Sequence, residues 1–240
     1  MNATRRHAKK QAALHQFERW SKTYDRSILQ FLLFRPTFEI LLEEVVRWRR
    51  GEDGARETAF SVLDVGCGTG IWASLVRAAG LPASVVGLDF SPEMCRRARE
   101  RADTVGANGT SFVNADSEHL PFRDGSFDLV TCSHSFHHYP HQQEVVRDMN
   151  RVLRPGGRLL LVDGFRDNII GWAVFDVGVT RAEGNNVYHV PWSEMRGLFA
   201  DAGFVDVCQR KFNIWAPALL TMAMKADPAG THGAGGQAVQ

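Results

Sequence analysis

Three glycines at alternate positions follow a short apolar run and could hold a ligand against the backbone. The run is Phe60–Val65, and the glycines are Gly66, Gly68 and Gly70. Because glycine has no Cβ atom and tolerates positive φ angles, such a turn allows close approach to the main chain. A helical pattern begins at Ile71, so the N–H groups at a helix start would face the same ligand. The stretch therefore predicts a strand, a ligand-binding glycine turn and a helix.

Carboxylates stand where successive strands are expected to end. Asp64 lies near the end of the first run, Asp89 follows the apolar run 84–88, and Asp116 follows a short run at 111–114. In a doubly wound sheet, an acidic residue at the tip of the second strand holds a ribose, since a carboxylate accepts hydrogen bonds from both hydroxyls. A nucleoside-containing ligand is the expected occupant of this edge.

The elements that must position these groups alternate along the chain, which is typical of an α/β fold with a mostly parallel sheet. Ser91 starts a helix, because a proline and an acidic residue follow it. The side chains of that helix expected to face the sheet are Met94, Ala98, Ala102 and Val105. A last helix is capped at Ser193 and stopped at Gly203. Strands are expected at 60–65, 84–88, 111–114, 127–132, 158–163, 204–209 and 214–224, the last two as an antiparallel hairpin.

The overall composition argues against several classes of protein. The 240 residues carry 28 Lys and Arg against 27 Asp and Glu, a net charge of +1, which disfavours binding that depends on phosphate backbones. The four cysteines are scattered, so neither a metal site nor a disulfide framework is expected. No run approaches the roughly 18 apolar residues of a membrane span, and no signal peptide is evident. We expect a cytoplasmic monomer or homodimer that acts on a small molecule, without nucleic acid or integral membrane contact.

Three stretches resemble the class I S-adenosylmethionine-dependent methyltransferases: "LDVGCGTG" at 63–70, "VVGLDFSPEM" at 85–94 and "RVLRPGGRLLLVD" at 151–163. The resemblance implies S-adenosylmethionine as the cofactor. It also implies a Rossmann-like, seven-stranded, mostly parallel sheet with helices on both faces, an antiparallel last strand and an N-terminal helical cap. The residues that it places around the cofactor are Tyr24, Asp64, Gly66, Cys67, Gly68, Gly70, Asp89, Phe90, Met94, Asp116, Ser117 and Ser133.

The resemblance assigns each of these groups a part of the cofactor. The glycine turn would take the amino-acid end, with Ser133 nearby, and Asp89 would take the ribose. Phe90 and Met94 would pack on the adenine, and Asp116 would accept a hydrogen bond from its amino group. Cys67 is most simply a small residue that fills space in the turn.

The same resemblance divides the chain into segments. Residues 1–57 form the helical cap, in which Tyr24 lies over the methionine end or packs between helices. Residues 58–225 form the methyltransferase domain, with an insertion or lid at 164–191. Residues 226–240 lack periodicity and are expected to be disordered.

Four histidines are candidates for a general base, because the ordinary pKa of histidine lies near neutrality. His134, His137 and His138 follow the fourth strand and face the expected position of the methyl group, and His189 lies late in the insertion. A structural or solvated role stays open for each. The insertion begins apolar and aromatic, with Trp172 among its residues, and this composition favours a small aromatic or lipophilic acceptor over a polar one. Packing on the core or at a dimer interface is the alternative for this segment.

Three other functions remain open from the sequence. "YD" at 24–25 and "RVLRPGG" are similar to the quinone-biosynthesis C-methyltransferases, although the Met-Asn and His-Arg-x-Trp-Lys patterns of that group are absent. A nicotinamide-dependent dehydrogenase would carry Gly-x-Gly-x-x-Gly, but position 71 is Ile71. A non-catalytic S-adenosylmethionine-binding protein would share the cofactor motifs.

Overall fold

The structure is a computed structural model that describes residues 34–50, 58–164, 188, 190–212 and 217–228. Tyr24, Trp172 and His189 lie outside the described residues, as do most of the 1–57 cap, most of the 164–191 insertion and most of the 226–240 tail.

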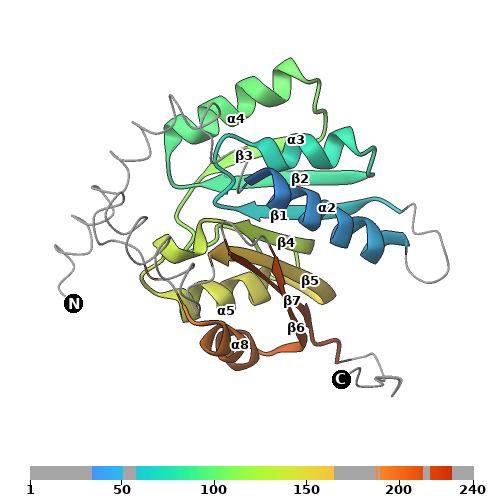
Figure 1. Cartoon of the computed structure of the whole chain (residues 1–240). Coiled ribbons are helices and arrows are strands. Elements are labelled where there is room, and N and C mark those ends of the chain that lie inside the picture. Colours follow the sequence, from blue (N-terminus) through green and yellow to red (C-terminus); the bar gives the residue numbers. More distant parts are fainter. Residues whose placement is uncertain (1–33, 51–57, 165–187, 189, 213–216, 229–240) are drawn as a thin grey trace.

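A seven-stranded sheet forms the centre of the molecule, in the order β3-β2-β1-β4-β5-β7-β6 (Figure 1). The first five strands pair in parallel, whereas β7 runs antiparallel to both β5 and β6. This is the predicted fold class. The strands are β1 Phe60–Val65, β2 Ala83–Asp89, β3 Thr110–Asn114, β4 Phe127–Ser133, β5 Leu153–Gly164, β6 Phe204–Phe212 and β7 Ala218–Lys225.

Helices cover both faces of the sheet (Figure 1), so the described elements form three layers. The described helices are α2 Arg35–Arg50, α3 Ile71–Ala78, α4 Pro92–Thr104, the short 3₁₀ helix η3 Phe136–His138, α5 Gln142–Val152 and α8 Trp192–Asp201. Alternate side chains of β1 enter the two cores: Val62 packs with α2, α3 and α4, and Leu63 packs with α5 and α8. Each face of the sheet therefore has its own apolar core, and the carboxyl ends of the parallel strands lie at one edge.

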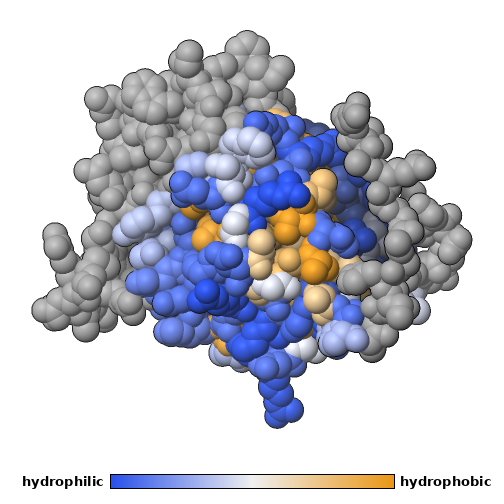
Figure 2. Space-filling view, turned by 90° about the horizontal axis from the view of Figure 1, so that it is seen from below, coloured by the Kyte–Doolittle hydropathy of each residue, from blue (hydrophilic) through white to orange (hydrophobic). Residues whose placement is uncertain are grey.

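The lower side of the molecule carries α8 and the edge strand β6. Hydrophobic residues gather in the middle of this face and hydrophilic residues surround them (Figure 2). Met195 and Phe199 of α8 are buried there, and Val207 of β6 packs partly against the same core. Among the described helices, none is long and apolar enough to cross a membrane.

Several local expectations were wrong. Val105 is 56% exposed, because it is the C-cap residue of α4 and the chain turns away from the sheet at Gly106, whose φ is 63°. The last helix begins one residue before Ser193, with Pro191 at the N-cap. The fifth strand begins at Leu153, which pairs with Phe127 before an irregularity in the register.

Candidate cofactor and acceptor site

The glycine turn joins β1 to α3 with all three glycines at positive φ, namely 74° at Gly66, 53° at Gly68 and 74° at Gly70. A Cβ atom on Gly66 would lie 2.2 Å from Oγ of Ser135, so this position has no room for a side chain. A Cβ atom on Gly68 would meet no atom within 4 Å. The turn is therefore packed tightly against the protein on one side and open at its centre.

Asp89, at the end of β2, links this turn to the start of α4. Its Oδ2 accepts a hydrogen bond from the N–H of Gly68 at 2.9 Å, and its Oδ1 accepts one from the N–H of Ser91 at 2.8 Å. Burial raises the pKa of Asp89, and these two N–H groups oppose the increase. A carboxylate has about four acceptor positions, so Asp89 keeps capacity for the two hydroxyls of a ribose.

Asn114 was not predicted as a site residue, yet it fixes the segment that follows Asp89. Its side-chain amide donates to the carbonyl oxygens of Asp89 and Phe90, at 2.9 and 2.8 Å. The available signal was its place as the last residue of β3, at the same edge of the sheet. Phe90 is 38% exposed, whereas Met94 is buried, so Phe90 offers the more accessible apolar surface.

Asp64 is a buried carboxyl group beneath the open part of the turn. It accepts a hydrogen bond from the hydroxyl of Thr131 on β4 at 2.9 Å. Burial raises the pKa of Asp64 to about 7, the Thr131 hydroxyl opposes this, and the charge of Asp89 adds to it. The small pocket at this point also contains two aromatic residues of the α2 region. Its lining is Phe34, Phe38, Asp64, Gly66, Cys67, Gly68, Thr69, Ile71, Trp72 and Ser133.

Cys67 is buried in the turn, and burial raises the pKa of its thiol well above the ordinary value. Its sulfur would lie 2.9 Å from a Cβ atom on Gly87 of β2. The side chain thus fills the space between the turn and the second strand, as expected.

Some polar groups of the loop after β3 contact other protein groups and are not all available to a ligand. Oδ1 of Asp116 accepts a hydrogen bond from the N–H of Glu118 at 3.0 Å. Burial raises the pKa of Tyr139 well above its ordinary value, and the hydroxyl of the buried Ser117 opposes this increase. The structure places both residues near the carboxyl edge, but the Ser117 side chain serves a protein contact.

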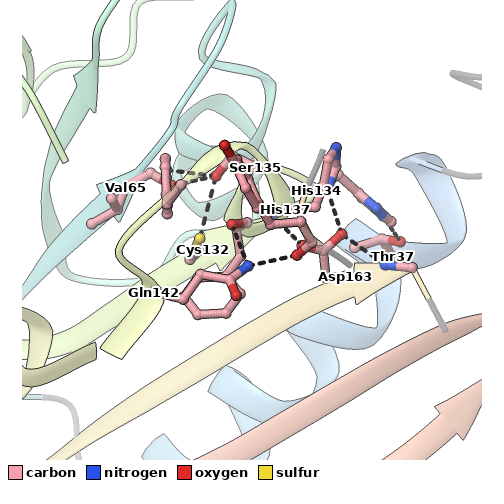
Figure 3. Close-up of polar contacts among 12 residues, drawn as sticks. Thr37, Val65, Cys132, His134, Ser135, His137, Gln142 and Asp163 are labelled. Carbon is pink, nitrogen blue, oxygen red and sulfur yellow. Dashed lines mark hydrogen bonds and ion pairs between the residues drawn. The ribbon is translucent and has the colours of Figure 1, made fainter. Parts of the chain in front are cut away.

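A cluster of hydroxyl groups fastens the loop after β4 to the glycine turn (Figure 3). Oγ of Ser135 donates to the carbonyl oxygen of Val65 at 3.2 Å. It also lies 2.9 Å from the hydroxyl of Tyr139 and 3.2 Å from the sulfur of Cys132. Sequence reasoning assigned neither Ser135 nor Tyr139 a role of its own, although both belong to the segment 134–139 that contains the candidate histidines.

His134 follows β4 with a φ of 50°, which is unusual for a residue with a side chain. Its Nε2 is 2.8 Å from the hydroxyl of Thr37 on α2. Its ring meets that of Phe34 edge to face, with centroids 5.1 Å apart. Burial lowers the pKa of His134 to about 4, against the charge of Asp163. The imidazole is therefore neutral at physiological pH and is held by the helical layer.

His137 forms a buried pair with Asp163 at the end of β5 (Figure 3). Nδ1 of His137 is 2.6 Å from Oδ1 of Asp163, and the backbone N–H of His137 donates to Oδ2 at 2.8 Å. The N–H of Gly164 donates to Oδ1 at 2.7 Å. The half-buried ring of His138 lies 4.1 Å from that of His137, centroid to centroid. Asp163 was expected only as the end of a strand.

Together these groups suit S-adenosylmethionine. The open backbone at Gly68 and the buried carboxyl group of Asp64 suit a zwitterionic amino-acid end, and Asp89 suits a ribose. The exposed ring of Phe90 suits an adenine. Among the described residues, no group of three or more His, Cys, Asp or Glu side chains could hold a metal ion.

Comparison with known proteins gives consistent matches. Residues 63–161 match the family described as Methyltransferase domain. The demethylmenaquinone methyltransferase of Geobacillus kaustophilus is 31% identical, with 84% of this chain and 92% of that protein covered. The enzyme of the same name from Listeria welshimeri is 34% identical, with 68% and 67% covered.

A solved structure has the same fold. A SAM-dependent methyltransferase from Aquifex aeolicus superposes with a TM-score of 0.62 at 21% identity, covering 85% of this chain and 96% of that one. These matches favour a methyltransferase over a nicotinamide-dependent dehydrogenase.

Proposed function

The chain belongs to the class I S-adenosylmethionine-dependent methyltransferases, and on this premise we propose that it methylates a ring carbon of a hydroxylated aromatic acceptor, a quinol. Its relatives from Geobacillus and Listeria are named for methyl transfer to demethylmenaquinone. A quinone is electron-poor, whereas its reduced form is an electron-rich ring that can supply an electron pair. The reduced form is therefore the proposed acceptor.

The observation that carries this proposal is the composition of the pocket beside the glycine turn. Phe34 and Phe38 line it together with Asp64 and the open backbone at Gly68. Aromatic side chains favour flat, apolar partners. A charged acceptor such as an amine or a carboxylate would need charged partners. Among the described lining residues the only ionisable carboxyl group is that of Asp64, which suits the cofactor.

The proposed roles of the cofactor residues follow the geometry. Backbone N–H groups of the turn and Asp64 bind the amino-acid end, Asp89 binds the ribose, and Phe90 packs on the adenine. Asp116 contacts the adenine through what remains of its acceptor capacity. When bound, S-adenosylmethionine supplies a methyl group on a positively charged sulfur. The protein then has to align the acceptor with this methyl group and to exclude water.

The experiment is methyl transfer from isotopically labelled S-adenosylmethionine to a naphthoquinone that lacks a ring methyl group, in oxidised and dithionite-reduced form. Transfer to the reduced form alone, with the label on a ring carbon by mass spectrometry, is the expected result. Transfer only to a panel of amines, or to the hydroxyl oxygen, would refute the acceptor assignment. Isothermal titration with S-adenosylhomocysteine checks in parallel that the protein binds the demethylated cofactor.

A further inference from the structure

The buried pair of His137 and Asp163 has a geometry that defines one basic atom. The Asp163 carboxyl group accepts two backbone N–H bonds, from His137 and from Gly164, and its Oδ1 lies 2.6 Å from Nδ1 of His137. Both side chains are nearly inaccessible, at 10% exposed for His137 and 6% for Asp163. A buried carboxylate that receives several N–H groups favours its ionised form.

An ionised carboxylate can only accept hydrogen bonds, so Nδ1 of His137 must carry the proton. In a neutral imidazole the lone pair is then on Nε2. The backbone contact adds a second constraint, because the same carboxylate holds both the main chain and the ring of His137. Asp163 therefore fixes the tautomer and the orientation of this ring together.

The pair also lies at the carboxyl edge of the parallel strands, next to the ends of β4 and β5. β4 and β5 are adjacent parallel strands, and Ser133 at the end of β4 lines the pocket beside the glycine turn. His137 lies in η3, shortly after Ser133, and Asp163 is the penultimate residue of β5. Ligands of open α/β sheets bind outside these strand ends.

His134 is less suited to accept a proton. Its Nε2 is already in contact with the Thr37 hydroxyl. Its pKa is lowered to about 4, which makes it a weak base near neutrality. Among the described residues, no carboxylate oxygen lies within hydrogen-bond distance of the His134 ring, whereas Oδ1 of Asp163 lies 2.6 Å from Nδ1 of His137.

We propose that His137 accepts the proton that the acceptor hydroxyl loses during methyl transfer, and that Asp163 is the positioning residue that keeps Nε2 of His137 unprotonated. This rests on the proposed quinol acceptor. The acceptor O–H bond breaks, its proton bonds to Nε2, and its electron pair stays on the acceptor. The ring carbon then bonds to the methyl carbon, and the methyl–sulfur bond breaks and leaves its pair on sulfur.

Two further proton transfers make the ring aromatic again and return His137 to its starting state. The proton on the methylated carbon leaves to solvent, the C–H pair returns to the ring, and the oxygen recovers its proton from His137. One methyl group is transferred and one proton is released overall, so no oxidant or reductant is consumed.

The first test is Asp163→Asn, an isosteric change that can present an N–H group to Nδ1 and so move the ring proton to Nε2. Because general base catalysis contributes about 10²–10⁴-fold, kcat should fall by about 100-fold or more. The dissociation constant of S-adenosylhomocysteine should stay unchanged. Nitrogen NMR of the His137 ring in the S-adenosylhomocysteine complex should show the proton on Nδ1 in the parent and its transfer in the variant. The same tautomer in both would overturn the role of Asp163.

The second test separates chemistry from structure. His137→Gln should lose rate against ordinary phenolic acceptors and lose progressively less against acceptors whose hydroxyl is made more acidic by chlorine substituents. A deficit that is constant across the series would show a structural role. The matched control is Glu118→Gln, because His141 and Glu118 form a similar pair, with Nδ1 and Oε1 2.7 Å apart. An equal loss of kcat in this control would also count against the proposal.

Failure of the proposed function has a different signature. If the parent protein transfers no methyl group to any phenolic ring, the acceptor assignment fails and the assigned proton transfer fails with it. If the parent transfers methyl groups to the quinol but both variants keep full kcat, the acceptor assignment stands and the proton acceptor is another group.

Discussion

Adding one methyl group at Gly66 or at Gly68 should separate the stability of the protein from its affinity for the cofactor. Both residues have a positive φ, at 74° and 53°. A Cβ atom on Gly66 would lie 2.2 Å from Oγ of Ser135 and 2.9 Å from the hydroxyl of Tyr139. A Cβ atom on Gly68 would meet nothing within 4 Å. The two alanine variants therefore share the backbone strain and differ in the collision.

The magnitudes follow from these contacts. An alanine in the left-handed region costs about 1–2 kcal/mol at either position. Forcing Ser135 out of its place adds about 1–3 kcal/mol of overpacking at Gly66. Gly66→Ala should thus reduce the free energy of unfolding by about 2–5 kcal/mol, a large part of the total of about 5–15 kcal/mol of an ordinary domain. Gly68→Ala should reduce it by about 1–2 kcal/mol.

For cofactor affinity the order of the two variants is reversed, with Gly68→Ala affected more than Gly66→Ala. The methyl group of Gly68→Ala occupies the open space over the turn, and the affinity for S-adenosylhomocysteine should fall by about tenfold or more, which corresponds to about 1.4 kcal/mol. Urea unfolding without ligand and isothermal titration on the folded variants provide the two measurements. Ser135→Gly in the Gly66→Ala background should recover stability, because it removes the nearest colliding atoms.

Two results would refute this reasoning. Unchanged cofactor affinity in Gly68→Ala would mean that the space over Gly68 is not used by the cofactor. A loss of stability in Gly66→Ala no larger than that in Gly68→Ala would mean that the loop carrying Ser135 moves away at no cost, so the packing of this loop on the turn would not be constrained.

Three further predictions concern the acidic and hydroxyl groups. Asp89→Ala should weaken S-adenosylhomocysteine binding by at least about tenfold, because each ribose hydroxyl bond to a charged acceptor contributes about 1.5–3 kcal/mol, and parent-like affinity in titration calorimetry would contradict it. Asp64 should make the ligand-free protein less stable as the pH rises from about 4 to about 7: its folded pKa is about 7 against an ordinary 3.8, so in this window the folded state holds a proton that the unfolded chain has lost. Asp64→Asn should remove this slope, at most about 4 kcal/mol over the window, and an identical pH profile of urea unfolding would exclude Asp64 as its source. Ser135→Ala and Tyr139→Phe should show a coupling energy of about 0.5–1.5 kcal/mol in a double-mutant cycle of unfolding, and additive effects would mean that their 2.9 Å contact contributes nothing.

The sequence predicted the sheet well because its signals are local. The first strand has the expected bounds, and the glycine turn, the cap at Ser91 and the strand ends at Asp89 and Asn114 each depend on a few adjacent residues. The antiparallel final pair was also predicted correctly. The face of α3 is harder to read, since Trp72 and Val76 are buried there while Ile71 is only half-buried. In so short a helix, apolar residues at helical spacing occur on more than one face, so the spacing alone does not show which face is buried.

The residues that sequence reasoning missed depend on register between strands. Thr131 contacts Asp64 because the two residues are paired across β1 and β4, and their separation in the chain gives no hint of this. Asp163 reaches His137 because β5 pairs with β4 and ends beside η3, the short helix that follows β4. Asn114 pairs with Asp89 in the register of β2 and β3, which places its amide over the segment after Asp89.

The loop from Ser133 to Tyr139 contacts β1, α2 and β5, and this bears on how the reaction is aligned. Ser135 bonds to Val65 at the end of β1, directly before the glycine turn. His134 contacts α2 through Thr37, and His137 contacts Asp163 of β5. Methyl transfer requires nucleophile, carbon and sulfur in line, and a misplacement of about 1 Å can cost about 100-fold in rate. Because one short segment holds the cofactor turn on one side and the proposed base on the other, the two halves of the site share a single support. A substitution that loosens this loop should therefore lower kcat even when neither the cofactor nor the acceptor loses a direct contact.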